Sequence, residues 1–245
     1  INGGEHATVD AEGRCPFVLV ADAGEKLSVI GLVLRNQGKG GISAQHRGTR
    51  IKLHKVMLDG FGASRSKGAL YAVGATLDIR ESRFTGNSSE KGGALWLEKG
   101  AFAEVVDSLF SENRAQIGAA IYAFGDVELN LTGSRFTGNK TLSGGMGGAV
   151  ALRSNSILNG DKLHFQNNHA QGKGGAVYAE ESSSQKTCRI RLRDSTLQGN
   201  SASFGSGAGG GIDARNSVDV RLERVRFVDN QASTSGGGLF LYDIG

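Results

Sequence analysis

Residues 83–100 read RFTGNSSEKGGALWLEKG, and the rest of the chain repeats the pattern of this stretch. An aromatic residue, Phe84, is followed three positions later by Asn87. A polar turn then leads to the small residues of Gly-Gly-Ala, to Leu95, and to an alternating apolar run. This order is typical of a structural repeat, and nothing in it resembles a catalytic motif.

The two motifs recur along the chain in constant order. The small-residue motif ends at aliphatic positions 25 to 35 residues apart: Ile42, Leu70, Leu95, Ile121, Val150, Val177, Ile212 and Leu239. Before most of these comes Phe/Leu-Xaa-Xaa-Asn, at 84–87, 110–113, 136–139, 165–168, 197–200 and 227–230. Degraded copies stand at 33–36 and 57–60, where Gly60 replaces Asn. Such regular recurrence predicts one repeating structural unit.

Apolar and polar residues alternate within each repeat, as in a β-strand. Val218, Val220 and Leu222, for example, alternate with charged residues. A coil of short strands cannot bury its own apolar face, so neighbouring coils must stack. We therefore predict an all-β protein: a single-stranded, right-handed parallel β-helix of about eight coils, roughly 35–40 Å long. Residues 1–245 are expected to form one domain, with a degenerate first coil at 1–30 and expanded loops within 181–208.

Stacking places equivalent residues directly above one another. The aromatic positions should form an internal column of Phe84, Phe110, Phe136, Phe165 and Phe227, with Leu197 in one coil. The asparagines should form a structural ladder of Asn87, Asn113, Asn139, Asn168, Asn200 and Asn230. In such a ladder each amide bonds to its neighbours and to its own turn backbone.

The same register predicts which charges meet on the outside of the helix. Asp161, Arg193 and Glu223 should share one outward column, and Arg189 should meet Asp219. Opposite charges in adjacent strands form ion pairs of modest strength. Arg191 should lie opposite Arg221, which is unfavourable unless a partner or an anion lies over the pair.

The paired motifs resemble the repeats of the chlamydial polymorphic outer membrane proteins, which combine Gly-Gly-Ala-(Ile/Leu/Val) with Phe-Xaa-Xaa-Asn. The resemblance covers roughly residues 30–245, and Ala119, Gly211 and Gly238 depart from the strict tetrapeptide. It implies the passenger of an autotransporter, a right-handed parallel β-helix exposed at the cell surface and acting in adhesion. The family offers no catalytic residues to carry over.

Composition excludes several other classes of protein. The chain has 39 Gly but 1 Pro and no Gly at every third position, which excludes collagen. Its net charge of +4 is spread along the sequence, so no nucleic-acid partner is expected. No run is long enough to span a membrane, and no histidine spacing predicts a metal or other cofactor. Cys15 and Cys188 should lie on the order of 25 Å apart, too far for a mutual disulfide.

The most informative outward column follows the aliphatic residue of each small-residue motif. It forms a stripe expected to be exposed: Tyr71, Trp96, Tyr122, Tyr178 and Phe240, extended by Phe124. Such a stripe can bind a protein or glycan ligand. In the alternative interpretation, the rings contact one another and seal the sheet.

These observations predict a non-enzymatic adhesion or interaction module, exposed at the cell surface or secreted. The first alternative is a structural scaffold or linker subunit in a large protein assembly. The second is a polysaccharide-active enzyme, which would need clustered carboxylates on one sheet. The outward carboxylates, such as Asp78, Glu104, Glu128 and Asp161, are mostly in different columns or separated by coils.

Overall fold

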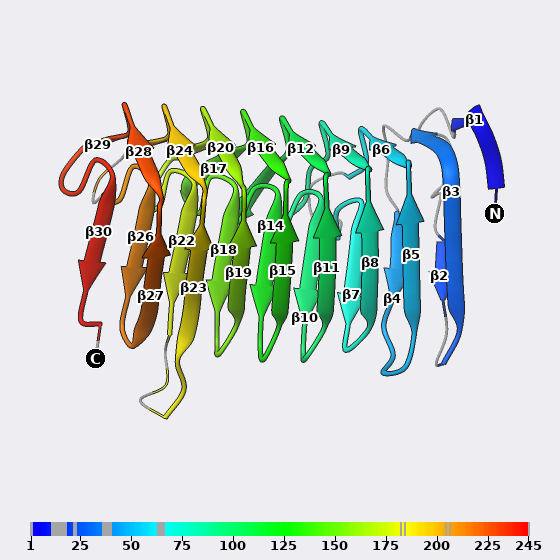
Figure 1. The fold of residues 1–245 in the computed structure, drawn as a ribbon, viewed down its shortest axis with the longest axis horizontal. Coiled ribbons are helices and arrows are strands. Elements are labelled where there is room, and N and C mark those ends of the chain that lie inside the picture. Colours follow the sequence, from blue (N-terminus) through cyan, green and yellow to red (C-terminus); the bar gives the residue numbers. More distant parts are fainter. Residues whose placement is uncertain are drawn as a thin grey trace.

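The computed structural model describes residues 2–10, 19–21, 24–35, 41–62, 67–181, 183, 185–203, 205 and 207–244, with only the backbone of the first two segments. The described residues form a parallel β-solenoid of about eight stacked coils, seen side by side in Figure 1. The part of the chain that the structure describes contains no helix long and apolar enough to cross a membrane.

Each full coil contributes a long strand and a short strand to one 16-stranded sheet. The long strands are β3 (Lys26–Arg35), β5 (Arg50–His54), β8 (Thr76–Arg80), β11 (Phe102–Val106), β15 (Glu128–Thr132), β19 (Ile157–Asp161), β23 (Cys188–Arg193) and β27 (Val218–Glu223). The short strands are β6 (Met57–Asp59), β9 (Arg83–Thr85), β12 (Leu109–Ser111), β16 (Arg135–Thr137), β20 (His164–Gln166), β24 (Thr196–Gln198) and β28 (Arg226–Val228). The row of long strands and the row of short strands meet at β3, which pairs with both β5 and β6. β1 (Asn2–Asp10) also pairs with β3.

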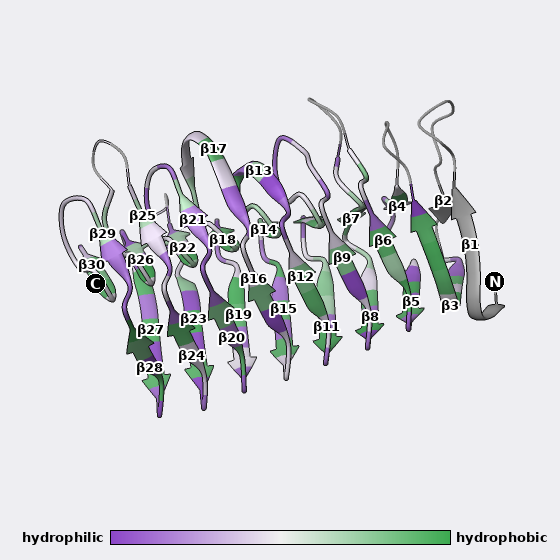
Figure 2. Cartoon of the chain, turned by 90° about the horizontal axis from the view of Figure 1, so that it is seen from above, coloured by the Kyte–Doolittle hydropathy of each residue, from purple (hydrophilic) through white to green (hydrophobic). Residues whose placement is uncertain are grey.

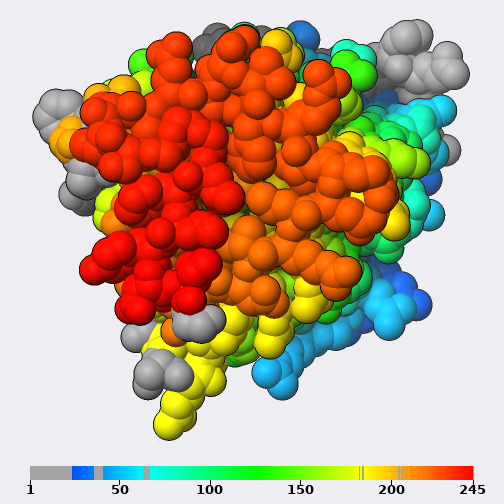
Figure 3. All heavy atoms as spheres, turned by 60° about the vertical axis from the view of Figure 1, so that its left-hand side comes forward, coloured from blue at the N-terminus to red at the C-terminus, as the bar shows by residue number. Residues whose placement is uncertain are grey.

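The small-residue motifs lead into a nine-stranded sheet on another side of the coil. Its strands are β2 (Leu19–Ala21), β4 (Ile42–Ala44), β7 (Leu70–Val73), β10 (Leu95–Glu98), β14 (Ile121–Phe124), β18 (Val150–Arg153), β22 (Val177–Glu180), β26 (Ile212–Arg215) and β30 (Leu239–Tyr242). A five-stranded sheet contains β13 (Arg114–Ile117), β17 (Lys140–Met146), β21 (His169–Ala170), β25 (Ser201–Ala202) and β29 (Gln231–Ala232). Residues of β26 to β30 form the end of the stack that comes forward in Figure 3.

Inward-facing side chains form one continuous core along the stack. Figure 2 shows the resulting alternation of hydrophobic and hydrophilic residues along the strands. The predicted phenylalanine column is present: the rings of Phe84, Phe110, Phe136 and Phe165 stack at centroid distances of 4.9, 4.8 and 4.8 Å. This spacing follows from the inter-strand distance of a parallel sheet, which fixes the separation of equivalent residues.

The predicted asparagine ladder is confirmed from Asn87 to Asn230. Asn113 illustrates the bonding: its backbone N–H and its Nδ2 both donate to Oδ1 of Asn139, at 3.0 and 2.9 Å. Its Nδ2 also donates to the backbone oxygen of Phe84, at 2.9 Å. Oδ1 of Asn113 in turn accepts the backbone N–H and the Nδ2 of Asn87, at 3.1 and 3.0 Å, so every polar atom of this buried amide is hydrogen-bonded.

The structure corrects the register of the degraded early copies. Leu58 pairs with Phe84, so the position equivalent to Asn87 is Phe61 and the predicted Gly60 is wrong by one residue. Phe61 is fully buried, and its N–H donates to Oδ1 of Asn87 at 2.9 Å. The asparagine ladder therefore ends at an apolar residue, Phe61. The backbone N–H of Phe61 still supplies a hydrogen bond to Oδ1 of Asn87, the first asparagine of the ladder. Leu34 pairs with Leu58, so the copy at 33–36 shifts in the same way.

A second ladder, of buried serines, was not predicted from the sequence. It contains Ser82, Ser108, Ser134 and Ser195. Ser108 Oγ donates to the backbone oxygen of Val106 at 2.8 Å and accepts the N–H of Ser82 at 3.1 Å. The residue before each serine turns the corner with a positive φ, for example 48° at Asp107. The signal was available, because Ser stands two residues before the aromatic position in these coils.

The predicted charge register is confirmed, although not every predicted ion pair forms. Arg193 lies between Asp161 and Glu223 in adjacent strands and bonds Asp161 at 2.9 Å. Glu223 instead bonds its neighbour Arg224, which also bonds Asp194 at 2.6 Å. Arg189 lies opposite Asp219, but they form no ion pair among those of the described residues. Exposed side chains can exchange one ion-pair partner for another with little change in the free energy of folding.

The remaining sequence predictions concern the connection at 181–188 and the cysteines. Among the described residues before β23, Lys186 Nζ lies 3.4 Å from Oδ1 of Asp126, and residues 185–187 project beyond the neighbouring turns in Figure 1. Cys188 is a free, buried thiol, and burial raises its pKa to about 12. Cys15 lies outside the described residues, so the predicted absence of a bond between them stays a prediction.

Candidate functional site: the aromatic face of the nine-stranded sheet

The predicted aromatic residues do share one column of the nine-stranded sheet. Tyr71, Trp96 and Tyr122 occupy equivalent positions in β7, β10 and β14. The column continues through Ala151, Tyr178, Asp213 and Phe240. We call the outer surface of this sheet, from Tyr71 to Phe240, the aromatic face.

The expectation that the whole column is exposed is wrong. Tyr71, Tyr122 and Tyr178 are 8%, 3% and 1% exposed, whereas Phe124 is 39% exposed and Trp96 and Phe240 are half-buried. Tyr122 and Tyr178 form a separate apolar cluster with Ala151, against which Ile117 and Met146 pack. The alternative interpretation, a sealed sheet, therefore describes the middle of the face.

The residue directly before the first glycine of each small-residue motif changes in character from coil to coil. Lys91, Ile117 and Met146 occupy this position in successive coils and lie in register with one another. Where the position is Ile or Met, an apolar side chain covers the tyrosines. Where it is Lys91, or Lys67 before Gly68, a cation lies over the rings instead.

Cations contact the aromatic rings at both ends of the face. Lys67 Nζ lies 3.8 Å from the ring centroid of Tyr71. Lys91 Nζ lies 5.4 and 5.5 Å from the centroids of Trp96 and Tyr122. At the other end, the guanidinium of Arg215 lies 4.7 Å from the ring centroid of Phe240. These distances are within the range of favourable cation–π attraction.

Glu98 joins the rings at the N-terminal end of the face. It accepts a hydrogen bond from Tyr71 Oη at 3.1 Å and one from Trp96 Nε1 at 2.8 Å. Trp96 also contacts Tyr71 and Tyr122 edge-to-face, at 5.6 and 6.3 Å between centroids. Burial and then the charge of Glu98 raise the pKa of Tyr71 to about 12, so its hydroxyl remains a donor. These contacts fix the rings of Tyr71 and Trp96 in one orientation.

The carboxylates farther along the face each have an arginine partner. Arg153 bonds Glu180, and Arg215 bonds Asp213 at 2.6 and 3.0 Å. Burial acts to raise the pKa of Glu180, but bonds from Arg153 and Tyr178 outweigh it and lower that pKa. Burial dominates at Asp213 and raises its pKa despite Arg215.

The outward carboxylates of the long strands include one pair in directly opposed positions. Asp78 and Glu104 lie opposite each other in β8 and β11. Arg80 donates to both, at 2.7 and 2.8 Å. Among the described residues, no group of three or more His, Cys, Asp or Glu could hold a metal ion.

Comparison with known proteins agrees with the repeat pattern. Residues 162–180 match the sequence model of the Chlamydia polymorphic membrane protein repeat. A second similarity is to the probable autotransporter YfaL of Escherichia coli (strain K12), which is 33% identical over 156 residues. That alignment covers 63% of this chain and 10% of YfaL, so this chain spans only a small part of its relative's length. No solved structure matches. The chain therefore resembles autotransporter repeats of the polymorphic membrane protein type.

Proposed function

We propose that this β-helix is a surface-exposed, non-enzymatic interaction module that binds a protein partner through the N-terminal end of its aromatic face. The similarity to a probable autotransporter and to polymorphic membrane protein repeats suggests a surface protein. The binding surface, the partner and the absence of catalysis are our proposal.

The observation that carries the proposal is the cluster of Lys67, Tyr71, Lys91, Trp96 and Phe124, which we call the aromatic–lysine patch. Phe124 is among the exposed large hydrophobic residues and stacks on Tyr122, which the half-buried Trp96 contacts from the adjacent strand. Trp and Tyr side chains held rigidly in one place are typical of the residues that dominate binding energy in protein interfaces. Because Glu98 fixes the rings beforehand, little conformational entropy is lost on binding.

The geometry favours a protein over a glycan as the ligand of this patch. A sugar ring stacks on a free aromatic face, but Lys67 and Lys91 already lie over the rings of Tyr71 and Trp96. Trp96 additionally contacts a tyrosine on either side. The lysines instead suit a partner that presents carboxylates around an apolar centre, because opposite charges complement each other across an interface.

The test measures adhesion of beads coated with the purified chain to cultured animal cells. Trp96→Ala combined with Phe124→Ala should reduce adhesion about tenfold or more, because each large aromatic contact contributes at least ~1 kcal/mol. Phe102→Ala is the matched control, since Phe102 is a half-buried aromatic on the long-strand sheet. Circular dichroism and thermal melts check that each variant remains folded.

The source of the ligand is distinguished by treating the cells before the assay. Loss of adhesion after brief protease treatment, but not after glycosidase treatment, would support a protein partner. Loss only after glycosidase treatment, or equal adhesion of both variants and the wild type, would contradict the proposal. Stoichiometric self-association of the chain through the patch would favour the scaffold alternative.

A further inference from the structure

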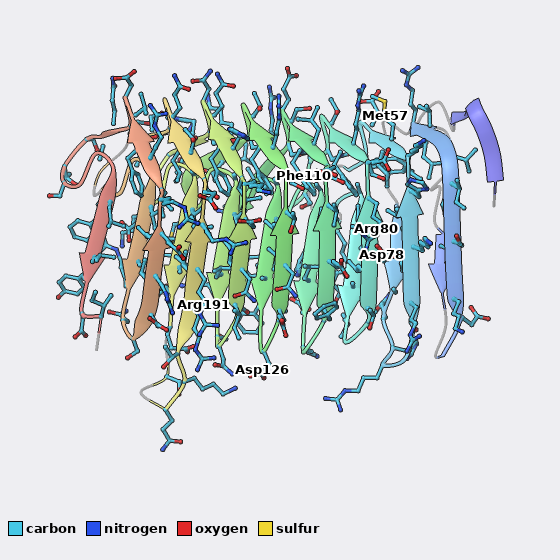
Figure 4. All side chains as sticks on the ribbon, viewed as in Figure 1. Met57, Asp78, Arg80, Phe110, Asp126 and Arg191 are labelled. Carbon is cyan, nitrogen blue, oxygen red and sulfur yellow. The ribbon has the colours of Figure 1, made fainter. Side chains whose placement is uncertain are left out.

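The central outward column of the long strands changes its chemistry along the rod. In register, it contains Lys52, Asp78, Glu104, Asn130, Asn159, Arg191 and Arg221. Acidic residues in β8 and β11 give way to amides in β15 and β19 and then to arginines in β23 and β27. Figure 4 shows Arg191 on the same sheet as Asp78 and Arg80, at the opposite part of the stack.

Arg191 and Arg221, like Arg189 and Asp219 in the same two strands, have no partner among the interactions of the described residues. Arg193 bonds Asp161, and Arg224 bonds both Asp194 and Glu223. The acidic end of the column is neutralised by Arg80. Two guanidiniums in directly opposed positions of adjacent strands repel each other. An anion lying over the pair would remove this repulsion.

A depression of about 370 Å³ lies beside the two arginines. It crosses four coils, and its polar walls include Asn130, Thr132, Asn159, Arg191 and Arg221. The carboxylates that also line it, Asp161 and Glu223, are bonded to Arg193 and Arg224. Asn159 Nδ2 donates to Asn130 Oδ1 at 2.8 Å, so the amides form a fixed row leading to the arginines.

We propose that this depression binds an acidic polysaccharide lying along the rod axis, with an anionic group of one sugar held between Arg191 and Arg221. Guanidinium groups recognise carboxylate and sulfate oxygens through paired, charge-assisted hydrogen bonds. The amides and the Thr132 hydroxyl supply donors and acceptors for sugar hydroxyls. This site is on a different sheet from the aromatic–lysine patch and does not depend on the function proposed for it.

The lining of the depression favours a polysaccharide over other polyanions. It contains no aromatic residue, and base stacking on aromatic rings is the usual means of holding single-stranded nucleic acid. It also lacks the large aromatic anchor that is typical of a protein interface. A row of amides and hydroxyls ending in two arginines matches a chain of hydroxyl groups with periodic negative charge.

The experiment measures binding of the purified chain to three oligosaccharide probes by calorimetry. A heparin oligosaccharide carries sulfates and carboxylates, an oligogalacturonate carries carboxylates alone, and a dextran oligosaccharide is neutral. At least one acidic probe should bind, more weakly as salt is raised, and dextran should not bind. Binding of heparin alone assigns the site to sulfate, and binding of both acidic probes assigns it to carboxylate as well.

Arg191→Gln combined with Arg221→Gln should weaken acidic-probe binding about tenfold or more, because hydrogen bonds between charged groups are lost. The matched control is Arg50→Gln with Lys52→Gln, which removes the same charge from β5 of the same sheet. An equal loss in both pairs would show non-specific attraction and overturn the proposal. Binding of dextran, no binding of either acidic probe, or equally tight binding of polyglutamate would overturn it as well. A thermal melt confirms that both double variants are folded.

Discussion

Replacing Asn139 with alanine tests the asparagine ladder at its centre. The side chain makes four hydrogen bonds in a fully buried position. Its Oδ1 accepts the N–H and the Nδ2 of Asn113, at 3.0 and 2.9 Å. Its Nδ2 donates to the backbone oxygen of Phe110 at 3.0 Å and to Asn168 Oδ1 at 2.9 Å. Alanine removes all four bonds and adds none.

The expected cost follows from this count. Four bonds at about 1 kcal/mol each give a loss of about 4 kcal/mol in the free energy of unfolding. The loss is concentrated on Asn113, whose two donors are left buried and unsatisfied, and burial keeps water from replacing the missing oxygen. The expected range is therefore about 3–5 kcal/mol, which is large for a single substitution.

The assay is urea unfolding followed by circular dichroism, with the midpoint and the slope m determined for each variant. Asn230→Ala is the matched control, because Asn230 has the same bonding to Asn200 but is only partly buried. Water can replace its partners, so its cost should be about 1–2 kcal/mol. Equal midpoints for the wild type and Asn139→Ala, or a larger cost at Asn230, would refute the reasoning.

Substitutions at three further positions test other parts of the structure. Ser108→Ala removes one donor and one acceptor from the serine ladder and should cost about 1–2 kcal/mol by urea unfolding; no change would contradict the ladder. Phe136→Ala should cost about 3–5 kcal/mol, and Phe136→Leu clearly less because Leu197 already occupies an equivalent position; equal costs would contradict the ring column. Asp213→Asn tests how the stability of the folded state depends on pH. Because burial raises the pKa of Asp213 in the folded state, ionisation favours the unfolded state once pH rises above 3.8. The wild type should therefore lose stability relative to Asp213→Asn as pH rises from below 3.8 to above the folded-state pKa, and the opposite trend in paired melts would exclude a raised pKa.

The early coils show when the Phe-Xaa-Xaa-Asn motif predicts the strand register correctly and when it does not. The motif at 84–87 correctly placed the ladder wherever both Phe and Asn were present, because stacking repeats one geometry in every coil. Where both residues were replaced, the alignment slipped by one position, and only pairing of Leu58 with Phe84 resolved it. A one-residue slip moves every side chain to the opposite face of the strand, but Met57 and Leu58 are both apolar, so alternation did not decide which of them points inward.

The sequence by itself determined the periodicity of this protein, and with it the parallel β-solenoid and the residues that share each column. Equivalent residues stack because adjacent parallel strands are held at a fixed distance, so spacing along the chain converts directly into columns in space.

Only the tertiary structure decided which outward columns meet solvent. Tyr122 and Tyr178 occupy outward strand positions, yet Ile117 and Met146 from another side of the coil cover them. The tertiary structure also decided that Glu223 pairs with Arg224, because side-chain reach and competition among neighbours are not encoded in strand alternation. Burial depends on what packs above a residue, whereas alternation specifies only the side of the strand on which it lies.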